Sequence, residues 1–348
     1  MVGAHVTDAW TRPEDRGRML YMYTVFIAGL AAPLFLFLSG LTIAMAASAR
    51  ATRVGHAAAA AMARWRGLQV LGLAFLFRLQ SQLLGWGAFS NILKVDILNV
   101  MGIAMMAAAV LWGWAMGRAT RIALFAIATA AIAMSTPLVR EAAWLSMLPD
   151  PIEAYIRPLP GRTNFALFPW AAFVVAGAIV GEVIHAAKSA RDERRLQGAL
   201  LVAGLGGIAA AYVLSFQPSI YPVSNFWTSS PTFFFIRLGI CAALVPIARA
   251  VDAFHRLVRA RIHDLPPDVP GRVITTLGRS SLFVYWIHVE MAYGGIARPV
   301  KRALSLEMTL VATVLLCALL YAITRWKDRS MQDVQLTGAL RILAPVLK

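Results

Sequence analysis

Nine runs of roughly 20 apolar residues divide this chain of 348 residues, and they constrain its fold more than any other feature. A helix of this length crosses the hydrocarbon layer of a bilayer, where no water satisfies exposed backbone groups. The runs also lack the alternation of a barrel strand. We therefore predict an all-α fold, a polytopic integral membrane helix bundle. The predicted spans are 19–48, 67–88, 93–116, 122–138, 165–187, 197–216, 232–250, 273–295 and 305–324.

The composition agrees with a membrane protein. Hydrophobic residues make up 59% of the chain, and the mean hydropathy is +0.67, more apolar than one soluble core requires. The net charge of +16 would fit nucleic acid, but the basic residues stand between apolar runs, so we expect membrane lipids and no nucleic acid as partners. No metal-ligand or phosphate-loop motif stands in a meaningful context, and we predict no metal site. We predict one domain over 1–348.

Basic residues in the connections predict the orientation. Nineteen Lys and Arg residues lie in one set of alternate loops, and ten lie in the other. The richer set consists of 49–66, 117–121, 188–196, 251–272 and 325–348. Cytoplasmic loops carry the excess of Lys and Arg, so the tail 325–348 is predicted to be cytoplasmic. Nine crossings then place residues 1–18 outside, in a membrane that we expect to be a bacterial-type inner membrane.

Three segments lie between or beside the spans, and two of them allow more than one interpretation. Topology is equally compatible with residues 1–18 as the remainder of a longer first helix and as a true start with a short translocated tail. Residues 261–272 are predicted to form a cytoplasmic Pro-rich linker. The end of the chain, 334–348, is either a short interfacial helix or an irregular tail.

Ionisable residues inside the spans are the first candidates for function, because a charge near the bilayer centre costs about 2.5–3.5 kcal/mol. Arg78 shares a helix face with Gln82, and Asp96 shares one with Asn99. Asp96 is a candidate partner of Arg78; a structural hydrogen-bond clamp or ion pair is an equally good interpretation. Three further arginines also lie within spans: Arg237, Arg249 and Arg279. For Glu182 and His185, at a cytoplasmic helix end, we favour side chains that extend to the interface.

The span 273–295 is the most informative. Ser281, Tyr285 and His288 follow the spacing i, i+4 and i+7, which is one stripe of a helix. A histidine on such a stripe is either a hydrogen-bonded structural residue or a catalyst. A second histidine, His5, is followed by Asp8 three residues later. Histidine titrates near neutrality and accepts a proton from an attacking group, with a carboxylate to fix its tautomer.

Five segments carry a resemblance to the transmembrane acyltransferases, and among them to the group with a heparan-α-glucosaminide N-acetyltransferase-type catalytic region. They are "MVGAHVTDAW", "LAAPLFLFLSGLTIAMAASAR", "ILKVDILNVMGIAM", "FALFPWAAFVVAGAIVGEVI" and "LGRSSLFVYWIHVEMAYG". In such proteins an Arg-Gly segment and about ten apolar residues precede the histidine that His5 matches. The resemblance therefore implies an upstream helix, ten crossings and two cytoplasmic ends.

The resemblance implies acyl transfer across the membrane, from a cytoplasmic acyl-CoA, such as acetyl-CoA, to an outer acceptor, expected to be a carbohydrate. The implied catalytic residues are His5, Asp8, Asp96, Tyr285 and His288. Candidates for acceptor binding are Arg78, Asn99, Trp170, Arg237 and Arg279. Candidates for the CoA phosphates are Arg50, Arg53, Arg64 and Arg66, which the orientation rule explains equally well.

The expected mechanism has His5, oriented by Asp8 or Asp96, as the general base that deprotonates the acceptor. Tyr285, His288 or Arg78 would offset the charge on the tetrahedral oxygen. A covalent acyl-histidine is a second route. A transporter or flippase of a polar or anionic molecule and a non-catalytic scaffold are the alternatives. The acyl group, the acceptor and the oligomeric state, a homodimer included, stay open.

Overall fold

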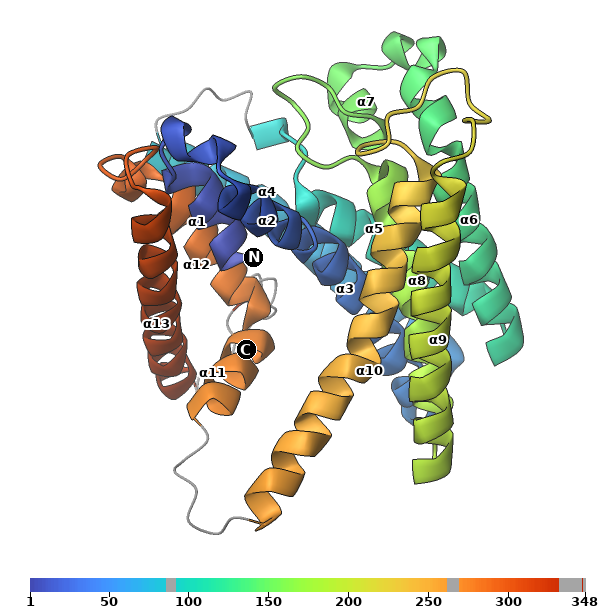
Figure 1. The fold of residues 1–348 in the computed structure, drawn as a ribbon. Helices are drawn as coiled ribbons and strands as arrows, with labels where there is room; N and C mark the ends of the chain where they lie inside the picture. The colour runs from blue at the N-terminus through green and yellow to red at the C-terminus, as the bar shows by residue number, and fades with distance from the viewer. Residues whose placement is uncertain (86–91, 262–268, 332–345, 347–348) are drawn as a thin grey trace. The chain divides into compact units, whose positions relative to one another are not determined.

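The structure is a computed structural model that describes residues 1–85, 92–261, 269–331 and 346 (Figure 1). Over these residues the chain is built from helices, joined by loops that contain two isolated β-bridges. The predicted all-α fold is confirmed. The greater part of the predicted Pro-rich linker and nearly all of the predicted tail segment lie outside the described residues.

Within the described residues, seven helical segments are long and apolar enough to cross a membrane. They are Met19–Val54, Ile97–Trp114, Arg118–Glu141, Leu167–Ala186, Ala190–Leu214, Pro231–Arg261 and Leu306–Ser330. Each coincides with one of the nine predicted spans. The other two predictions are not among them. The described part of 67–88 lies in the helix α4 (His56–Gly85), where Arg78 and several glutamines interrupt the apolar residues. The run 273–295 is divided between α11 (Val269–Arg279) and α12 (Ser281–Tyr293).

The chain folds into two compact units. The terminal unit contains Met1–Ala32, Gly72–Ile92 and Pro266–Lys348, and the central unit contains Pro33–Leu71 and Leu93–Leu265. Two helices, α3 (Ala31–Val54) and α4, contribute residues to both units.

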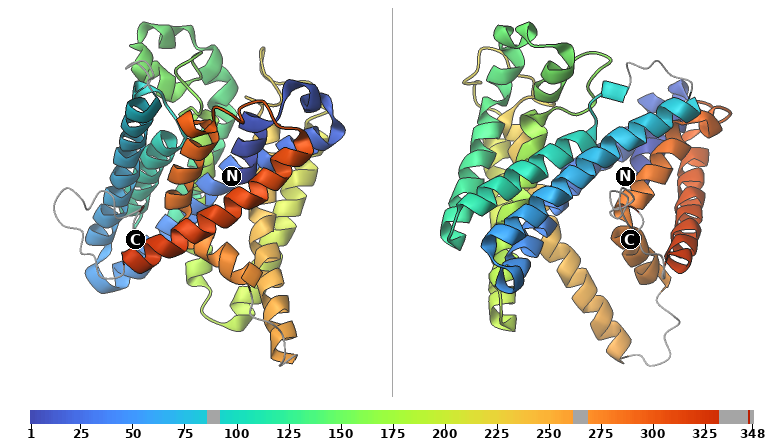
Figure 2. Two further views of the ribbon diagram at one scale, coloured as in Figure 1. Left: turned by 90° about the vertical axis from the view of Figure 1, so that its left-hand side faces the viewer. Right: turned by 180° about the vertical axis from the view of Figure 1, so that it is seen from behind.

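The central unit is a bundle built around α5 and α8. Besides its parts of α3 and α4, its elements are α5 (Ile97–Trp114), α6 (Arg118–Glu141), η3 (Ala143–Met147), α7 (Asp150–Ile156), α8 (Leu167–Ala186), α9 (Ala190–Leu214) and α10 (Pro231–Arg261). The apolar stretches of α5 and α8 are 61% buried, against 17% for α9, so α5 and α8 form the core. The outer helices α9 and α10 lie side by side (Figure 1 and Figure 2).

Two glycines allow α3 and α8 to approach closely. A Cβ atom on Gly40 would overlap the carbonyl group of Val174, and a Cβ on Gly177 would overlap that of Phe37. Small residues have this role where membrane helices cross, because the backbones can then make direct van der Waals contact. This crossing fixes α8 against α3 inside the central unit.

The terminal unit brings both ends of the sequence together. Besides the second part of α4, its elements are α1 (Val2–Trp10), η1 (Pro13–Gly17), α2 (Met19–Ala28), α11, α12, η4 (Gly295–Ala297) and α13 (Leu306–Ser330). The helix α1 packs against α12 and α13 through a buried cluster of Val6, Val284, Leu316 and Leu320. The hydrophobic contact of Val6 with Val284 places α1 beside the polar stripe of α12.

Candidate functional site

The helix α12 carries the polar stripe expected from the sequence. Tyr285 and His288 lie one turn apart and are 3% and 0% exposed. Their rings meet edge to face, with centroids 5.7 Å apart. Ser281, the first residue of the stripe, is partly buried at the start of the helix. The predicted helical stripe is therefore confirmed, and it faces the interior of the terminal unit.

The tautomer of His288 follows from its hydrogen bond. Its Nδ1 atom lies 2.6 Å from the carbonyl oxygen of Val284, which can only accept, so Nδ1 carries the proton. In the neutral ring the Nε2 atom then holds a lone pair. This atom is buried and has no hydrogen-bond partner among the described residues. A buried imidazole whose acceptor nitrogen has no partner among the described residues can accept a hydrogen bond from a donor group.

His5 lies beside His288. The two ring centroids are 5.2 Å apart, and the rings are inclined by 45°. His5 projects from α1, where the neighbouring Val6 is fully buried against Val284. The packing of α1 on α12 thus brings two histidines from opposite ends of the sequence into one site.

Tyr293 connects His5 with Asp8. Its hydroxyl group donates a 2.7 Å hydrogen bond to Oδ2 of Asp8 and lies 3.3 Å from Nδ1 of His5. Tyr293 is the last residue of α12 and is 40% exposed, and Asp8 is exposed in the last turn of α1. The site therefore runs from the exposed Asp8 to the buried His288.

The second part of α4 packs along the same face of α12. Phe77 contacts the ring of Tyr285, and Ser81 donates a 2.8 Å hydrogen bond to Glu290. Arg78, a predicted acceptor ligand, lies on this part of α4, whereas Arg279 is exposed at the end of α11. Arg78 therefore lies on a helix that contacts α12, and the binding role of both arginines remains a prediction.

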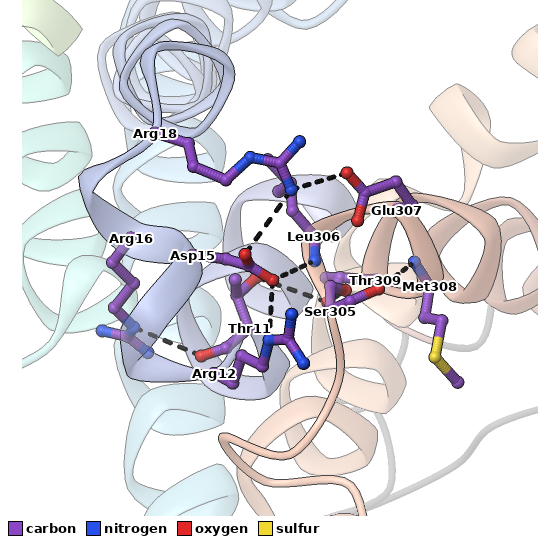
Figure 3. Close-up of polar contacts among 10 residues, drawn as sticks. All are labelled: Thr11, Arg12, Asp15, Arg16, Arg18, Ser305, Leu306, Glu307, Met308 and Thr309. Atoms are coloured by element: carbon purple, nitrogen blue, oxygen red, sulfur yellow. Dashed lines mark hydrogen bonds and ion pairs between the residues drawn. The ribbon is translucent and has the colours of Figure 1, made fainter.

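The N-terminal segment is attached to the start of α13 by a cluster of polar contacts (Figure 3). Thr11 pairs with Leu304 in a β-bridge, and the backbone N–H of Arg12 donates to the Leu304 carbonyl at 2.9 Å. The carboxylate of Asp15 accepts from Arg12 and from the backbone N–H of Leu306 at 2.9 and 3.0 Å. It therefore acts as a remote cap of α13. These contacts hold α1, and with it His5, in position.

Charge assists this attachment. Burial alone would raise the pKa of Asp15, but the hydrogen bonds from Arg12 and Leu306 and the charges of Arg12 and Arg18 lower it below its ordinary value. Arg18 also pairs with Glu307 at 2.6 Å (Figure 3). Asp15 is thus held as an anion at the start of α13.

Asp96 and Asn99 lie in the central unit, where they cap the start of α5. Asp96 is the N-cap, and the side chain of Asn99 accepts from the Asp96 backbone N–H at 3.0 Å, which completes a capping box. Asn99 also donates to the hydroxyl group of Tyr155 at 3.0 Å. These contacts give both residues a structural role. Their predicted roles in catalysis and acceptor binding remain predictions.

Arg237, in the apolar first half of α10, lies over aromatic rings. Its guanidinium carbon is 3.9 Å from the centroid of Phe233 and 5.9 Å from that of Trp170. Cation–π contact of this kind stabilises a partly desolvated charge. Trp170 and Arg237, both predicted to bind the acceptor, are therefore neighbours in the central unit.

A cavity of about 670 Å³ lies between α3, α4 and α5 in the central unit. Two of the four predicted CoA-binding arginines, Arg50 and Arg66, line it, whereas Arg53 and Arg64 are exposed and do not. The remaining lining residues are Thr42, Ile43, Ala46, Ala61, Met62, Trp65, Gln69 and Met105. The cavity combines two cationic groups with a largely apolar wall.

The favoured interpretation of Glu182, an extension to the interface, is wrong. Glu182 is 2% exposed, and its carboxylate accepts hydrogen bonds from Ser48 at 2.5 Å and from the indole of Trp112 at 2.7 Å. It also pairs with Arg121 at 3.4 Å. The packing of α3, α5 and α6 around α8 buries a carboxylate that hydropathy assigns to a helix end, while His185 is exposed as expected.

Two elements of these sites were missed from the sequence. Tyr293 lies five residues after His288 and so off its stripe, and no local pattern connects it with Asp8. The Glu182 network joins residues of four helices. In both cases the contact depends on how separate helices pack against each other. The spacing of residues along one helix carries no information about that packing.

The family model of the heparan-alpha-glucosaminide N-acetyltransferase catalytic region matches residues 1–218. No curated protein and no solved structure matches the chain significantly. The family match covers more than half of the chain, and it includes His5, Asp8 and both arginines of the cavity. The chain therefore belongs to the family of heparan-alpha-glucosaminide N-acetyltransferase catalytic regions, which are membrane acetyltransferases.

Proposed function

We propose that the chain transfers an acyl group from acyl-CoA to an acceptor at the other face of the membrane, with the histidine pair of the terminal unit as its catalytic centre. The observation that carries this proposal is the 5.2 Å separation of the His5 and His288 rings. Two imidazoles at this separation provide a base and a second proton-binding group within one site. Membership of the family supports acyl transfer as the reaction.

The proposed chemistry is direct transfer. The nitrogen or oxygen nucleophile of the acceptor attacks the thioester carbon, while the Nε2 atom of one histidine takes the proton that the nucleophile loses. The C–S bond breaks, and the CoA thiolate leaves and takes up that proton. We propose the second imidazole, when protonated, and the hydroxyl group of Tyr285 as donors to the oxyanion. Attack by His5 itself, to form an acyl-histidine, is the other route.

Acyl-CoA is the proposed donor, and the cavity of the central unit fits its chemistry. Arg50 and Arg66 supply guanidinium groups, which form bidentate hydrogen bonds with phosphate oxygens. Trp65, Met62 and Met105 supply apolar surface for the less polar parts of the donor. We therefore assign Arg50 and Arg66 to the CoA phosphates, with the cavity on the cytoplasmic side.

The proposed acceptor is a carbohydrate, and an amino sugar is the first compound to test, since the family is named for a glucosaminide. Trp170 beside Arg237 offers an aromatic face next to a cation, a combination that suits a sugar ring with polar or anionic substituents. Asn99 and Arg78 are the other proposed ligands.

The test uses the full chain in liposomes with radiolabelled acetyl-CoA outside and glucosamine or a glucosaminide inside, and the reverse. Mass spectrometry of the acceptor detects a covalent product. The wild-type protein and the exposed-site control His185→Gln should acetylate the acceptor, and His5→Gln should lose most of this activity. Movement of intact acetyl-CoA or acceptor across the bilayer, without a product, would instead support the transporter alternative.

A further inference from the structure

We propose that Tyr293 is a positioning residue, which together with Asp8 holds the proton of His5 on Nδ1 and directs the Nε2 lone pair of His5 toward the reaction. This inference rests on the proposed function, because it assigns a role to Tyr293 in the same site. It begins from the two contacts of one hydroxyl group: 2.7 Å to Oδ2 of Asp8 and 3.3 Å to Nδ1 of His5.

The direction of each hydrogen bond follows from the groups involved. An ionised carboxylate only accepts, so the single hydroxyl proton of Tyr293 is given to Asp8. The phenol oxygen then has only lone pairs to offer to His5. The Nδ1 atom of His5, which lies next to this oxygen, must therefore be the donor. The neutral ring of His5 thus carries its proton on Nδ1. The lone pair of His5 is left on Nε2.

The same arrangement occurs at the second histidine. His288 gives its Nδ1 proton to the Val284 carbonyl, so the acceptor nitrogen of its neutral ring is also Nε2. The two histidines of the site thus have the same tautomer, fixed by a backbone carbonyl in one case and by a tyrosine in the other. An imidazole whose proton sits on the wrong nitrogen cannot accept from the substrate, so this choice matters for catalysis.

The backbone around Asp8 is held by a separate contact. Arg16 donates from its guanidinium group to the backbone carbonyl of Asp8 at 2.5 Å and to that of Thr11 at 3.2 Å. These carbonyls lie at the C-terminal end of α1, where they lack helical partners. The carboxylate of Asp8 therefore stays free to accept from Tyr293.

A purely structural role does not explain the contact well. Asp8 is exposed and Tyr293 is 40% exposed, and a hydrogen bond between exposed groups adds little to the free energy of unfolding. The C-terminal end of α1 is already fixed by Trp10, whose indole N–H donates to the Ala292 carbonyl at 3.0 Å. Loss of the Tyr293 hydroxyl group should thus change His5 without loosening α1.

The experiment measures the tautomer of His5 directly, by ¹⁵N NMR of the full chain labelled with ¹⁵N-histidine in lipid bilayers. The chain has six histidines, and the His5→Gln variant identifies the His5 signals. In the wild-type protein at neutral pH, we expect the Nδ1–H form. Tyr293→Phe removes the acceptor, and Asp8→Ala frees the tyrosine proton to point at Nδ1. Both variants should shift His5 toward the Nε2–H form, whereas Tyr221→Phe, which loses an exposed hydroxyl contact with Met134, should leave it unchanged.

Kinetics with acetyl-CoA then tests the consequence. Tyr293→Phe and Asp8→Ala should each lower kcat about 10- to 100-fold with an unchanged KM for acetyl-CoA, and the double variant should be no worse than the poorer single one. An Nε2–H form of His5 in the wild-type protein, or the same tautomer in Tyr293→Phe, would overturn the inference. If the tautomer changes as expected but the wild-type protein transfers no acyl group, the inference about His5 stands and the proposed function fails.

Discussion

The rings of His5 and His288 lie with their centroids 5.2 Å apart, although the two residues come from opposite ends of the sequence. Three features hold them together: the packing of α1 on α12, the bridge between Thr11 and Leu304, and the attachment of Asp15 to the start of α13. Each of these features belongs to the terminal unit. A helix bundle can fold without two buried or half-buried imidazoles in contact. A catalytic role is therefore the most direct explanation of the histidine pair.

Replacement of His288 with leucine should separate function from stability. The substitution removes a buried Nε2 atom that has no partner among the described residues, together with one hydrogen bond to Val284. We expect the free energy of unfolding to change by less than about 1.5 kcal/mol, and kcat to fall about 100-fold or more. Chemical unfolding in detergent and acetyl transfer in liposomes measure the two effects. A variant that is strongly destabilised but remains active when folded would show that His288 is structural.

The attachment of Asp15 should weaken in acid. The pKa of Asp15 is lower in the folded than in the unfolded chain, so its stabilising effect is complete above the unfolded value of about 4 and is lost as the pH falls through the folded pKa. Asp15→Ala should therefore lower Tm at neutral pH, and its difference from the wild-type Tm should narrow below about pH 4.

Glu14 provides the matched control for this experiment. It is exposed on the same 3-10 helix as Asp15, so Glu14→Ala should leave Tm nearly unchanged at every pH. Thermal unfolding between pH 3 and pH 7 gives both comparisons. A Tm difference for Asp15→Ala that does not depend on pH would mean that charge has no part in the attachment.

The buried carboxylate of Glu182 should be important for the stability of the central unit. Glu182→Ala leaves the half-buried guanidinium of Arg121 without its counter-charge and removes the acceptor of the Trp112 indole. Loss of one partner of a buried pair destabilises by about 3–5 kcal/mol. The control Glu193→Ala breaks an exposed, solvent-screened pair with Arg249 and should change stability much less than Glu182→Ala does. Equal effects of the two variants would show that burial adds nothing to the Glu182 network.

The spanning helices could be predicted from the sequence because the thickness of a bilayer fixes the length of an apolar run. That argument found the seven helices that the structure describes as able to span a membrane, and helical spacing found the polar stripe of α12. It did not find the break at Ser280, between α11 and α12, because summed hydropathy does not register where a helix is interrupted.

Contacts between helices limited the prediction of the site. His5 and His288 were singled out by their chemistry, and Asp8 by its spacing from His5. Tyr293 was not, because its link to Asp8 depends on how α1 docks on α12. The burial of Glu182 likewise depends on the three helices packed around it. In the sequence, Asp96 and Asn99 form a paired polar motif that suggests a functional site. Their capping of α5 explains the same spacing without a catalytic or binding role.

The arginines of the cavity should affect the binding of acyl-CoA without affecting the chemical step. Arg66→Ala and Arg50→Ala should each raise the KM for acetyl-CoA about 10-fold or more, because a hydrogen bond to a charged group contributes about 1.5–3 kcal/mol, and should leave kcat unchanged. Arg66→Lys keeps the charge but not the planar fork and should be intermediate. Arg191, exposed on α9, supplies the control variant Arg191→Ala. An unchanged KM for acetyl-CoA in both cavity variants would contradict the assignment of the CoA phosphates to this cavity.

The most direct test of the histidine pair is the rate of CoA thiol release during acetyl transfer by four proteins in liposomes: the wild type, His5→Gln, His288→Gln and the double variant. If the two imidazoles act as one catalytic unit, each single variant should lose about 100-fold or more in kcat, and the double variant should be no slower than the slower single one. Wild-type rates in both single variants, with correctly folded protein, would contradict the account, because the contact between His5 and His288 would then have no part in acyl transfer.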